Sequence, residues 1–571
     1  MYNYQQVFDA SLEYFKGDEL AASVFAGKYA LQDAEGNYLE LTPDDMHHRL
    51  AAEFARMENK YKYNSMSYDE IYDLLKDFKY IVPQGSPMSG IGNEAKIQSL
   101  SNCFVIEAPA DSYAGILKAD QEQVQIMKRR GGVGFDVSTI RPKGMFTSNA
   151  AKTTDGIEVF LDRFSNSCRE VAQGGRRGAL MLSISVHHPQ VMDFIKIKRD
   201  LTRVTGANIS VRVTDEFMEA VKAGEDYKQR WPVESWDEHE VVNYTDANEV
   251  WNALIEGAHA SAEPGVLFWD TATKMTPSDA YEDLGFGSVS TNPCGEIILS
   301  PYDSCRLMLV NLTSFVKNPW TPKAEFDYGK FRLIAKKGQR LMDDMIDLEI
   351  EQVDKILDKI DSDPESDETK FYERNLWHNI RQAALNGRRT GLGITGLGDA
   401  IAMLGQIYGS DKSIKTVEEI YKWLSLASYE ESIQLAKERG SFPIWDKELE
   451  DDHPFLSRVI CELTPEVQED YRNYGRRNIA NTTTAPAGSV SCLTQTTSGI
   501  EPAFMLYYKR RKKVQNGEEV MFVDELGDEW TEFNVYHHKF KDWMDSTDPD
   551  CEWSADDLSE AISHSPYYQA T

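Results

Sequence analysis

Apolar side chains recur at helical spacing in the first 80 residues. Met46, Leu50, Phe54 and Met57 follow one another every three or four positions, which places them on one face of a helix. The preceding segment TPDD, at 42–45, has the residues of a helix start: Thr as N-cap, Pro at the first helical position and acids in the first turn. The pattern predicts that residues 1–80 form a helical region.

The pattern changes near residue 80, where short apolar runs are interrupted by Gly, Pro and Ser. Such runs predict strands that enter loops. Up to about residue 320 they alternate with helical stretches, and the clearest are ALMLSISV at 179–186, ANISVRV at 207–213 and EIILS at 296–300. This alternation predicts an α/β body.

Residues 329–440 return to a mostly helical pattern, and 509–523 predicts a β-hairpin with its turn at Asn516-Gly517. Within the helical stretch, residues 391–396 spell GxGxxG. This motif binds dinucleotides when a strand precedes it and a helix follows it. Because the residues before it, HNIRQAALNGRRT, have a helical and polar pattern, we interpret the glycines as sites of close helix packing.

Composition and charge narrow the function classes. Hydrophobic residues make up 41% and charged residues 27% of the chain, a normal globular balance. The 61 Lys and Arg against 93 Asp and Glu give a net charge of −32, which argues against general nucleic-acid binding and leaves room for a small phosphorylated substrate. The sequence has no apolar run long enough for a membrane span and no signal peptide pattern at its start, so a cytoplasmic location is expected. Its seven cysteines form no CxxC, so mostly reduced thiols are expected.

The segment Asn292-Pro293-Cys294-Gly295-Glu296 is the most informative for chemistry. In an extended chain alternate side chains share a face, which would place the amide, the thiol and the carboxylate together. These groups can anchor a ligand, carry a sulfur-centred redox step and act as a general base. The alternative is a buried cysteine beside a surface glutamate, and the spacing alone does not decide between the two.

Several motifs in one chain order make the sequence resemble the large catalytic subunit of ribonucleotide reductase. They are LSNCFV around Cys103, KRRGGVGFD at 128–136, QGGRRGA at 173–179, RVTGANISV at 203–211, NPCGE around Cys294, PYDSC ending at Cys305, and APAGSVS with TTSGIEP within 485–502. The resemblance covers roughly residues 15–525. It is closer to the compact cobalamin-type and related bacterial and phage members than to the long eukaryotic form.

The resemblance implies a fold and a reaction. The fold is a ten-stranded α/β barrel with a helical N-terminal region. Residues 1–80 would form that region without the family's ATP-binding cone. Residues 81–571 would form the catalytic barrel, with a helical insertion near 329–440 and without the usual C-terminal strands and Cys-pair tail. The reaction is the radical reduction of ribonucleotides, diphosphates in our prediction, to 2′-deoxyribonucleotides for DNA synthesis.

The resemblance also assigns roles to five residues. Cys294 would become a thiyl radical that takes the 3′ hydrogen, Glu296 would accept the 3′-hydroxyl proton, and Asn292 would hold the substrate. Cys103 and Cys305 would supply two electrons and end as a disulfide.

Further positions follow from the same resemblance. Substrate phosphate is expected at the loop Ala485-Pro486-Ala487-Gly488-Ser489, where small residues allow backbone amides to approach oxygen atoms, helped by Ser86, Gly131 and Gly132. The alternative for this loop is a plain strand-to-helix turn. A dNTP or ATP specificity effector is expected at a homodimer interface formed by Asp155, Arg176 and the loop Lys198–Gly206, which includes Arg203.

The radical source stays open between adenosylcobalamin and a separate small metal-containing subunit, and a thioredoxin- or glutaredoxin-type reductant is expected. We expect no metal site within the chain, because only one of its two Glu-x-x-His pairs, Glu256/His259 and not Glu450/His453, could lie on an apolar helix. The alternatives are a glycyl-radical enzyme of the formate-lyase type, disfavoured because no glycyl-radical loop is visible, and a non-catalytic nucleotide-sensing paralogue, disfavoured by the retention of all five residues.

Overall fold

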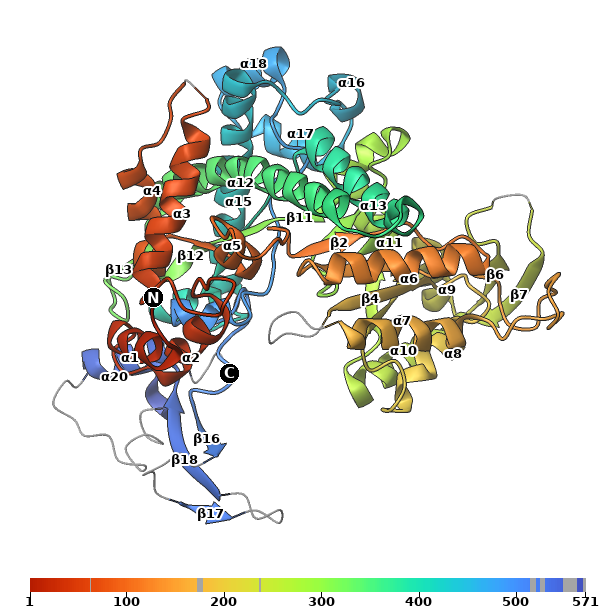
Figure 1. Ribbon diagram of the computed structural model, residues 1–571, viewed down its shortest axis with the longest axis horizontal. Coiled ribbons are helices and arrows are strands. Elements are labelled where there is room, and N and C mark those ends of the chain that lie inside the picture. Colours follow the sequence, from red (N-terminus) through yellow and green to blue (C-terminus); the bar gives the residue numbers. More distant parts are fainter. Residues whose placement is uncertain are drawn as a thin grey trace.

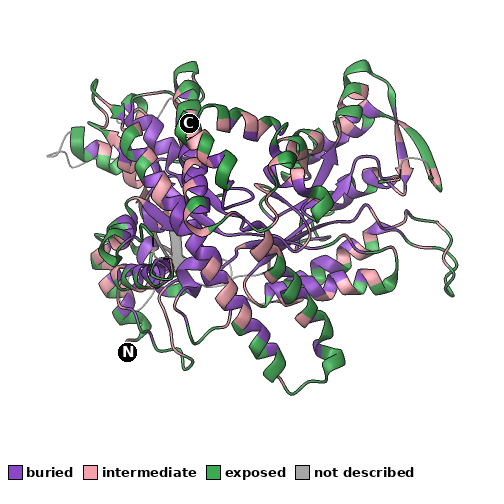
Figure 2. Cartoon of the chain, turned by 90° about the horizontal axis from the view of Figure 1, so that it is seen from above, coloured by how far each residue is buried: buried purple, intermediate pink, exposed green. Residues whose placement is uncertain are grey.

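The computed structural model describes the chain except residues 62, 172–177, 236–237, 514–519, 524–528, 548–561 and 568–571. Two groups of strands form the centre, and helices surround them (Figure 1). The buried segments run through the middle of the molecule, and the exposed segments lie at its edge (Figure 2). None of the helices within the described ranges is long and apolar enough to cross a membrane.

The N-terminal region is helical, as predicted. It contains α1 (Tyr4–Tyr14), α2 (Glu19–Lys28), α3 (Pro43–Glu58) and α4 (Tyr68–Leu75). Helix α3 begins after Thr42, and the Thr42 amide donates to the Asp45 carboxylate at 3.0 Å in a capping box. The predicted apolar stripe of α3 is fully buried.

Helix α3 also carries a buried carboxylate into the rest of the protein. Glu58, at its end, accepts hydrogen bonds from Arg340 at 3.0 Å and Arg439 at 2.5 Å, and the side chains of Glu58 and Arg439 are fully buried. The two arginines lie on α12 (Tyr328–Ser362) and α15 (Asp411–Arg439). The helical region is therefore joined to the body by ion pairs that water does not screen.

The other notable buried group of α3 is His47. Its ring lies edge-on to Phe78 with the centroids 4.6 Å apart, and among the described residues neither ring nitrogen has a hydrogen-bond partner. Burial lowers the pKa of His47 to about 3, which keeps the ring neutral.

We expect His47→Phe to stabilise the protein, most strongly at acidic pH. An exposed histidine titrates near 6.5, so below that pH the unfolded chain binds a proton that folded His47 does not. The free energy of unfolding then falls by about 1.4 kcal/mol per pH unit between about pH 6.5 and about pH 3. Above about pH 6.5, His47 is neutral in both states and costs no stability. As the pH falls through this window, the protein loses stability because only the unfolded chain takes up the proton. Thermal unfolding of both proteins across this pH range measures the difference. His48→Phe replaces the exposed neighbouring ring and is the control, and equal pH slopes for wild type and His47→Phe would contradict the assignment.

The first group of strands is a six-stranded sheet in the order β11-β2-β3-β4-β5-β8. Strands β2, β3, β4, β5 and β8 are parallel, and β11 runs antiparallel to β2 at one edge. Helices follow the strands, which confirms the predicted α/β alternation. The bounds are β2 (Cys103–Val105), β3 (Gly132–Asp136), β4 (Leu180–Ser185), β5 (Asn208–Val213), β8 (Gly265–Phe268), β11 (Ser304–Cys305), α6 (Tyr113–Met127), α7 (Ile157–Glu170), α8 (Val191–Lys196), α9 (Asp215–Ala223), α10 (Ala247–Ser261) and α11 (Trp269–Met275). The hairpin β6 (Asp226–Trp231) and β7 (Val241–Asp246) lies beside them.

The second group joins β1 (Ile81–Pro83), β12 (Leu307–Asn311) and β15 (Gly391–Thr395), and a parallel bridge adds Thr482 next to Leu392. The long helix α12 crosses from the N-terminal helices toward α13 (Asp367–Gly387) (Figure 1). Strand β15 lies inside the segment that we expected to be helical. A Cβ atom on Gly393 would lie 2.4 Å from the Thr483 carbonyl oxygen. The GxGxxG glycines of β15 therefore permit close approach of neighbouring strands, and the interpretation as helix packing is wrong for them.

The remaining elements complete the chain. They are α5 (Gly85–Gly90), β13 (Val316–Lys317), β14 (Glu325–Phe326), α14 (Leu397–Met403), α16 (Lys447–Glu450), α17 (Pro454–Cys461), α18 (Pro465–Tyr474), α19 (Val490–Thr494), β16 (Tyr507–Lys513), β17 (Phe522–Val523), β18 (Glu529–Tyr536) and α20 (His538–Thr547). The predicted hairpin at 509–523 does not form as expected, because β16 and β17 both pair with β18 and not with each other. Its predicted turn at 516–517 lies outside the described residues.

Candidate active site

The segment 292–297 is the turn of a short hairpin. Strands β9 (Ser290–Thr291) and β10 (Ile298–Leu299) pair antiparallel on either side of it. Gly295 has φ +78°, and its amide donates to the Asn292 carbonyl at 3.0 Å. The prediction of an extended segment with alternating side chains is therefore wrong, because a glycine at positive φ lets the chain reverse here.

The turn nevertheless brings the predicted polar groups together. The Asn292 side-chain amide donates to Glu296 Oε2 at 2.6 Å, and the Ile297 amide donates back to Asn292 Oδ1 at 3.3 Å. Asn292 is fully buried, whereas Cys294 is exposed at the tip of the turn. Burial raises the pKa of Glu296, which makes its carboxylate a stronger base. The hairpin thus presents an accessible thiol next to an oriented carboxylate.

Cys103 and Cys305 lie directly opposite each other on β2 and β11. Opposed residues of antiparallel strands have Cα atoms about 4.5–5.5 Å apart, within the span of about 4.4–6.8 Å that a disulfide bridges. Both side chains are buried, and burial together with the nearby charge of Glu296 raises the pKa of each thiol. The Cys103 thiol also interacts with Asn292 and Cys294. The structure therefore gathers all five predicted residues into one site.

The hairpin rests on the parallel sheet through positions without side chains. A Cβ atom on Gly132 would lie 2.9 Å from the Pro293 ring, and one on Gly134 would lie 1.8 Å from the Thr291 carbonyl oxygen. From β5, the Asn208 side chain donates to the Pro293 carbonyl at 2.7 Å. The glycines of β3 thus allow the hairpin to sit directly on the sheet.

We expect Gly134→Ala to displace this hairpin and to reduce turnover sharply. The new methyl group would overlap a backbone oxygen, which cannot rotate away. Overpacking of this kind costs about 1–3 kcal/mol of stability. The backbone that must move is that of Thr291, the residue before Asn292. Turnover and thermal unfolding measure both effects. Gly27→Ala, in α2, adds the same methyl group where nothing lies within 4 Å and is the control. Turnover near wild type in Gly134→Ala would contradict this seating of the hairpin.

The loop 485–489 lies next to the cysteine pair. Ala485 packs with Cys305 and Leu307, and the Gln84 side chain donates to the Pro486 carbonyl at 3.0 Å. Ser86 is held nearby, since its amide donates to the Asn102 side chain at 3.1 Å. The structure therefore brings Ser86 and the loop together, and Gln84, which sequence reasoning missed, connects them.

Gly131 and Gly132 lie differently. The Cβ position of Gly131 faces Phe104 and Ile126, and that of Gly132 faces Pro293. Gly132 is thus a close-packing position under the hairpin and Gly131 one against the hydrophobic core, and their contribution to substrate binding stays a prediction.

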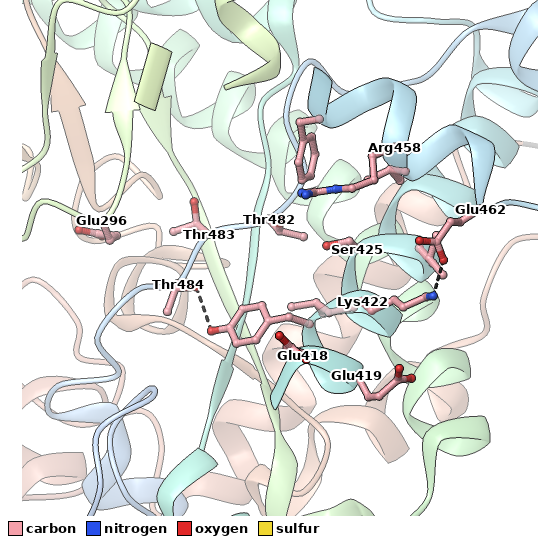
Figure 3. Close-up of a pocket in the computed structure, with 15 residues that line it drawn as sticks. Glu296, Glu418, Glu419, Lys422, Ser425, Arg458, Glu462, Thr482, Thr483 and Thr484 are labelled. Atoms are coloured by element: carbon pink, nitrogen blue, oxygen red, sulfur yellow. Dashed lines mark hydrogen bonds and ion pairs between the residues drawn. The ribbon is translucent and has the colours of Figure 1, made fainter. Parts of the chain in front are cut away.

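A cavity of about 910 Å³ opens beside Glu296 (Figure 3). Figure 3 shows Glu296 on one side of it and the ion pair of Lys422 and Glu462 on the other. Thr482–Thr484 form part of the wall between them. A second cavity of about 470 Å³ is also lined by Glu296. The site is therefore open to a ligand of nucleotide size.

A buried carboxylate on α12 supports the cysteine strands and was not found from the sequence. Glu349 accepts from the Leu100 amide at 2.5 Å and from Ser101 Oγ at 3.0 Å, just before β2. Ser101 Oγ also lies 3.3 Å from the Ser304 hydroxyl of β11, and this hydroxyl accepts from Arg306 at 2.9 Å. Glu349 and Arg306 are fully buried. These bonds fix the register of a strand pair that is only two residues long. The signal in the sequence that could have identified Glu349 is a carboxylate on the apolar face of a long helix.

The structure describes two of the three predicted effector residues, Asp155 and Arg203. Arg203 is paired with Asp162 at 2.6 Å and with Glu158 at 3.2 Å, both on α7. Asp155 is exposed just before that helix, and Arg176 lies outside the described residues. Their effector role stays a prediction.

Within the described part of the chain, no group of three or more His, Cys, Asp and Glu side chains is arranged to hold a metal ion. Of the two Glu-x-x-His pairs, Glu256 and His259 lie on α10, as predicted for a helical pair. Glu450 is instead buried in an ion pair with Arg476 at 2.7 Å.

Comparison with known proteins gives two family matches. Residues 15–91 match the family model described as the ribonucleotide reductase all-alpha domain, and residues 101–568 match the one described as the ribonucleotide reductase barrel domain. Together they span most of the chain and agree with its helical N-terminal region and α/β body.

Three curated relatives show the degree of similarity. The vitamin B12-dependent ribonucleoside-diphosphate reductase of Mycobacterium tuberculosis is 28% identical over 495 residues, which cover 86% of this chain and 62% of that protein. The enzyme of the same name from Thermoplasma acidophilum is 29% identical over 460 residues, 80% of this chain and 52% of the relative. The ribonucleoside-diphosphate reductase large subunit of Variola virus is 23% identical over 483 residues, which cover 79% of this chain and 58% of that protein. The chain thus spans between 52% and 62% of these relatives' lengths.

Proposed function

Because this chain belongs to the ribonucleotide reductase large-subunit family, with its all-alpha and barrel domains, we propose that it reduces ribonucleoside diphosphates to 2′-deoxyribonucleotides. The observation that carries the proposal is the cluster of three thiols. The opposed pair Cys103 and Cys305 lies beside the exposed Cys294, next to Glu296. Two thiols placed to form a disulfide supply the two electrons that the reduction requires.

The reaction begins at the exposed thiol. Cys294, as a thiyl radical, takes the 3′ hydrogen atom of the ribose. Glu296 accepts the 3′-hydroxyl proton, for which its raised pKa suits it, and Asn292 orients that carboxylate through the 2.6 Å hydrogen bond.

The cysteine pair completes the reduction. The 2′-hydroxyl leaves as water with a proton from the pair, and Cys103 and Cys305 give up two electrons and two protons in all as their disulfide forms. Cys294 returns the hydrogen atom to C3′. The net change is one ribonucleotide and two thiols to one deoxyribonucleotide, one disulfide and one water. Burial keeps both thiols protonated before the reaction, as this proton delivery requires.

Two radical sources are compatible with an exposed Cys294 beside an open cavity. The names of the Mycobacterium and Thermoplasma relatives support adenosylcobalamin. Adenosylcobalamin, when bound, supplies a one-electron oxidising equivalent. A separate metal-bearing subunit is the second candidate, supported by the Variola relative, which is a large subunit.

We further propose that a dNTP or ATP effector binds beside Asp155, in a homodimer that a thioredoxin- or glutaredoxin-type protein reduces. A cavity of about 280 Å³ near this residue supports the effector site, since it is lined by Thr154, Asn149 and Arg141, whose guanidinium is paired with Asp111 at 2.7 Å. Arginine is well suited to bind phosphate.

The test is an assay of CDP reduction with a chemical dithiol. The purified protein with adenosylcobalamin should form dCDP, and electron paramagnetic resonance should detect cob(II)alamin coupled to a thiyl radical. Activity that requires a metal-bearing partner and ignores cobalamin would overturn the cobalamin assignment and keep the reductase. No dCDP under either condition, with CDP still bound, would favour the nucleotide-sensing paralogue.

A further inference from the structure

We propose that Tyr29, in the N-terminal helical region, positions the loop 485–489 for the phosphate groups of the substrate. The inference rests on the proposed function and extends it, because it makes the helical region part of the substrate-binding apparatus.

The proposal starts from a contact between residues 460 positions apart. Tyr29 follows the last residue of α2, and its side chain is buried. Its hydroxyl lies 2.7 Å from Ser489 Oγ, at the end of the loop. Either hydroxyl could be the donor; when Tyr29, the more acidic phenol, donates, Ser489 Oγ accepts. The hydrogen of Ser489 is then left to point to a phosphate oxygen.

A second contact holds α2 against the segment 489–495, which begins at the last residue of the loop. Asp18, the N-cap of α2, accepts a hydrogen bond from the Gln495 side chain at 3.2 Å, and it is paired with His538 at 2.9 Å. The two ends of α2 therefore contact the two ends of the segment 489–495. The position of Tyr29 relative to Ser489 is fixed by this second anchor and does not depend on the tyrosine alone.

The barrel anchors the rest of the loop. Tyr421 on α15 shares a hydrogen bond of 2.9 Å with Thr484, drawn as a dashed line in Figure 3, and Gln84 donates to the Pro486 carbonyl at 3.0 Å. The Gly488 amide donates to Ser498 Oγ at 3.2 Å. The loop between these anchors consists of Ala, Pro, Ala and Gly, whose side chains make no hydrogen bonds. Ser489 is its one hydroxyl residue, and Tyr29 is the contact that orients it.

Tyr29→Phe removes one hydroxyl and keeps the buried ring. Ser489 then loses its partner, and its hydroxyl rotates freely or turns away from the phosphate. A neutral hydrogen bond of this kind changes affinity by about three-fold to ten-fold. The loss applies only to ligands with phosphate, because the proposed reaction brings the ribose to Glu296 and not to Ser489. We therefore expect a higher KM for CDP with little change in kcat.

The experiment compares the affinities of CDP and cytidine for the full chain by isothermal titration calorimetry, which requires no radical source. Tyr29→Phe should weaken CDP about three-fold to ten-fold and leave cytidine unchanged. Tyr72→Phe is the matched control, since it deletes a tyrosine hydroxyl that donates to Asp44 within the helical region, at 2.6 Å. It should leave both affinities unchanged.

A double-mutant cycle with Ser489→Ala completes the test. If Tyr29 acts through Ser489, the double variant binds CDP no more weakly than Ser489→Ala alone. Equal weakening of CDP and cytidine in Tyr29→Phe would show a general structural role and overturn the inference. So would a Tyr29→Phe variant with normal CDP affinity while Ser489→Ala is impaired. Normal CDP affinity in Ser489→Ala would also overturn the inference, because Tyr29 is proposed to act through that hydroxyl. A wild-type protein that does not bind CDP at all would instead be a failure of the proposed function itself.

Discussion

Cys294→Ser is expected to bring ribonucleotide reduction down to the detection limit. A serine hydroxyl can occupy the tip of the hairpin, but its O–H bond is much stronger than the S–H bond of a thiol. Every additional barrier of about 1.4 kcal/mol slows a reaction ten-fold. The hydrogen bond between Asn292 and Glu296 does not involve the thiol, so the site keeps its shape and CDP should bind as in wild type. Product analysis and calorimetric titration measure the two properties.

Cys461→Ser is the control for this substitution. Cys461 is also exposed, at the end of α17, and the proposed reaction does not use it. It should leave turnover unchanged. Substantial dCDP formation by Cys294→Ser would reject Cys294 as the hydrogen-abstracting thiol.

The second large effect concerns Cys103 and Cys305. With substrate and a radical source but no reductant, the wild-type protein should complete one turnover and stop. Peptide mapping should then find the two cysteines linked and Cys168 and Cys461 free. Their opposed positions on β2 and β11 require little movement of the strands for the bond to form. Replacing either cysteine by Ser should prevent even the first turnover, with or without reductant, because one thiol alone cannot supply the two electrons.

A matched comparison uses Cys168→Ser, which alters a buried thiol outside the site. It should retain both the single turnover and the later ones. Two free thiols at positions 103 and 305 after one confirmed turnover would exclude the disulfide.

The sequence predicts the parts of this protein that depend on local pattern. The N-cap at Thr42 and the apolar face of α3 were read directly from spacing, and the strands β4 and β5 appeared as apolar runs. Strand β15 was missed because its glycines weaken the strand pattern and the preceding helix α13 continues almost to its start. Whether such a glycine-rich segment is a strand depends on neighbours such as Thr483, which lie far away in the sequence.

In the candidate site, too, the sequence predicts the local motif but not the contacts with distant residues. The motifs identified Asn292, Cys294 and Glu296, but not the turn that unites them, because that turn depends on the positive φ of Gly295. Glu349 and Tyr29 were not predicted, since each acts through partners more than 200 residues away. Periodicity carries no information about such pairs.

The buried ion pairs of Glu58 bear on how the protein folds. Sequence comparison divides the chain into an all-alpha domain and a barrel domain. Arg340 and Arg439, however, belong to the barrel side and share the carboxylate of Glu58 on the helical side. A barrel expressed without its helical partner would lose this shared counter-charge, and the two arginines would keep only their barrel partners, Glu431 and Glu438 for Arg340 and Asp343 and Asp344 for Arg439. Breaking such a buried pair costs about 3–5 kcal/mol, a large part of the total stability of a typical domain. We therefore expect the helical region and the barrel to unfold together, in one cooperative transition.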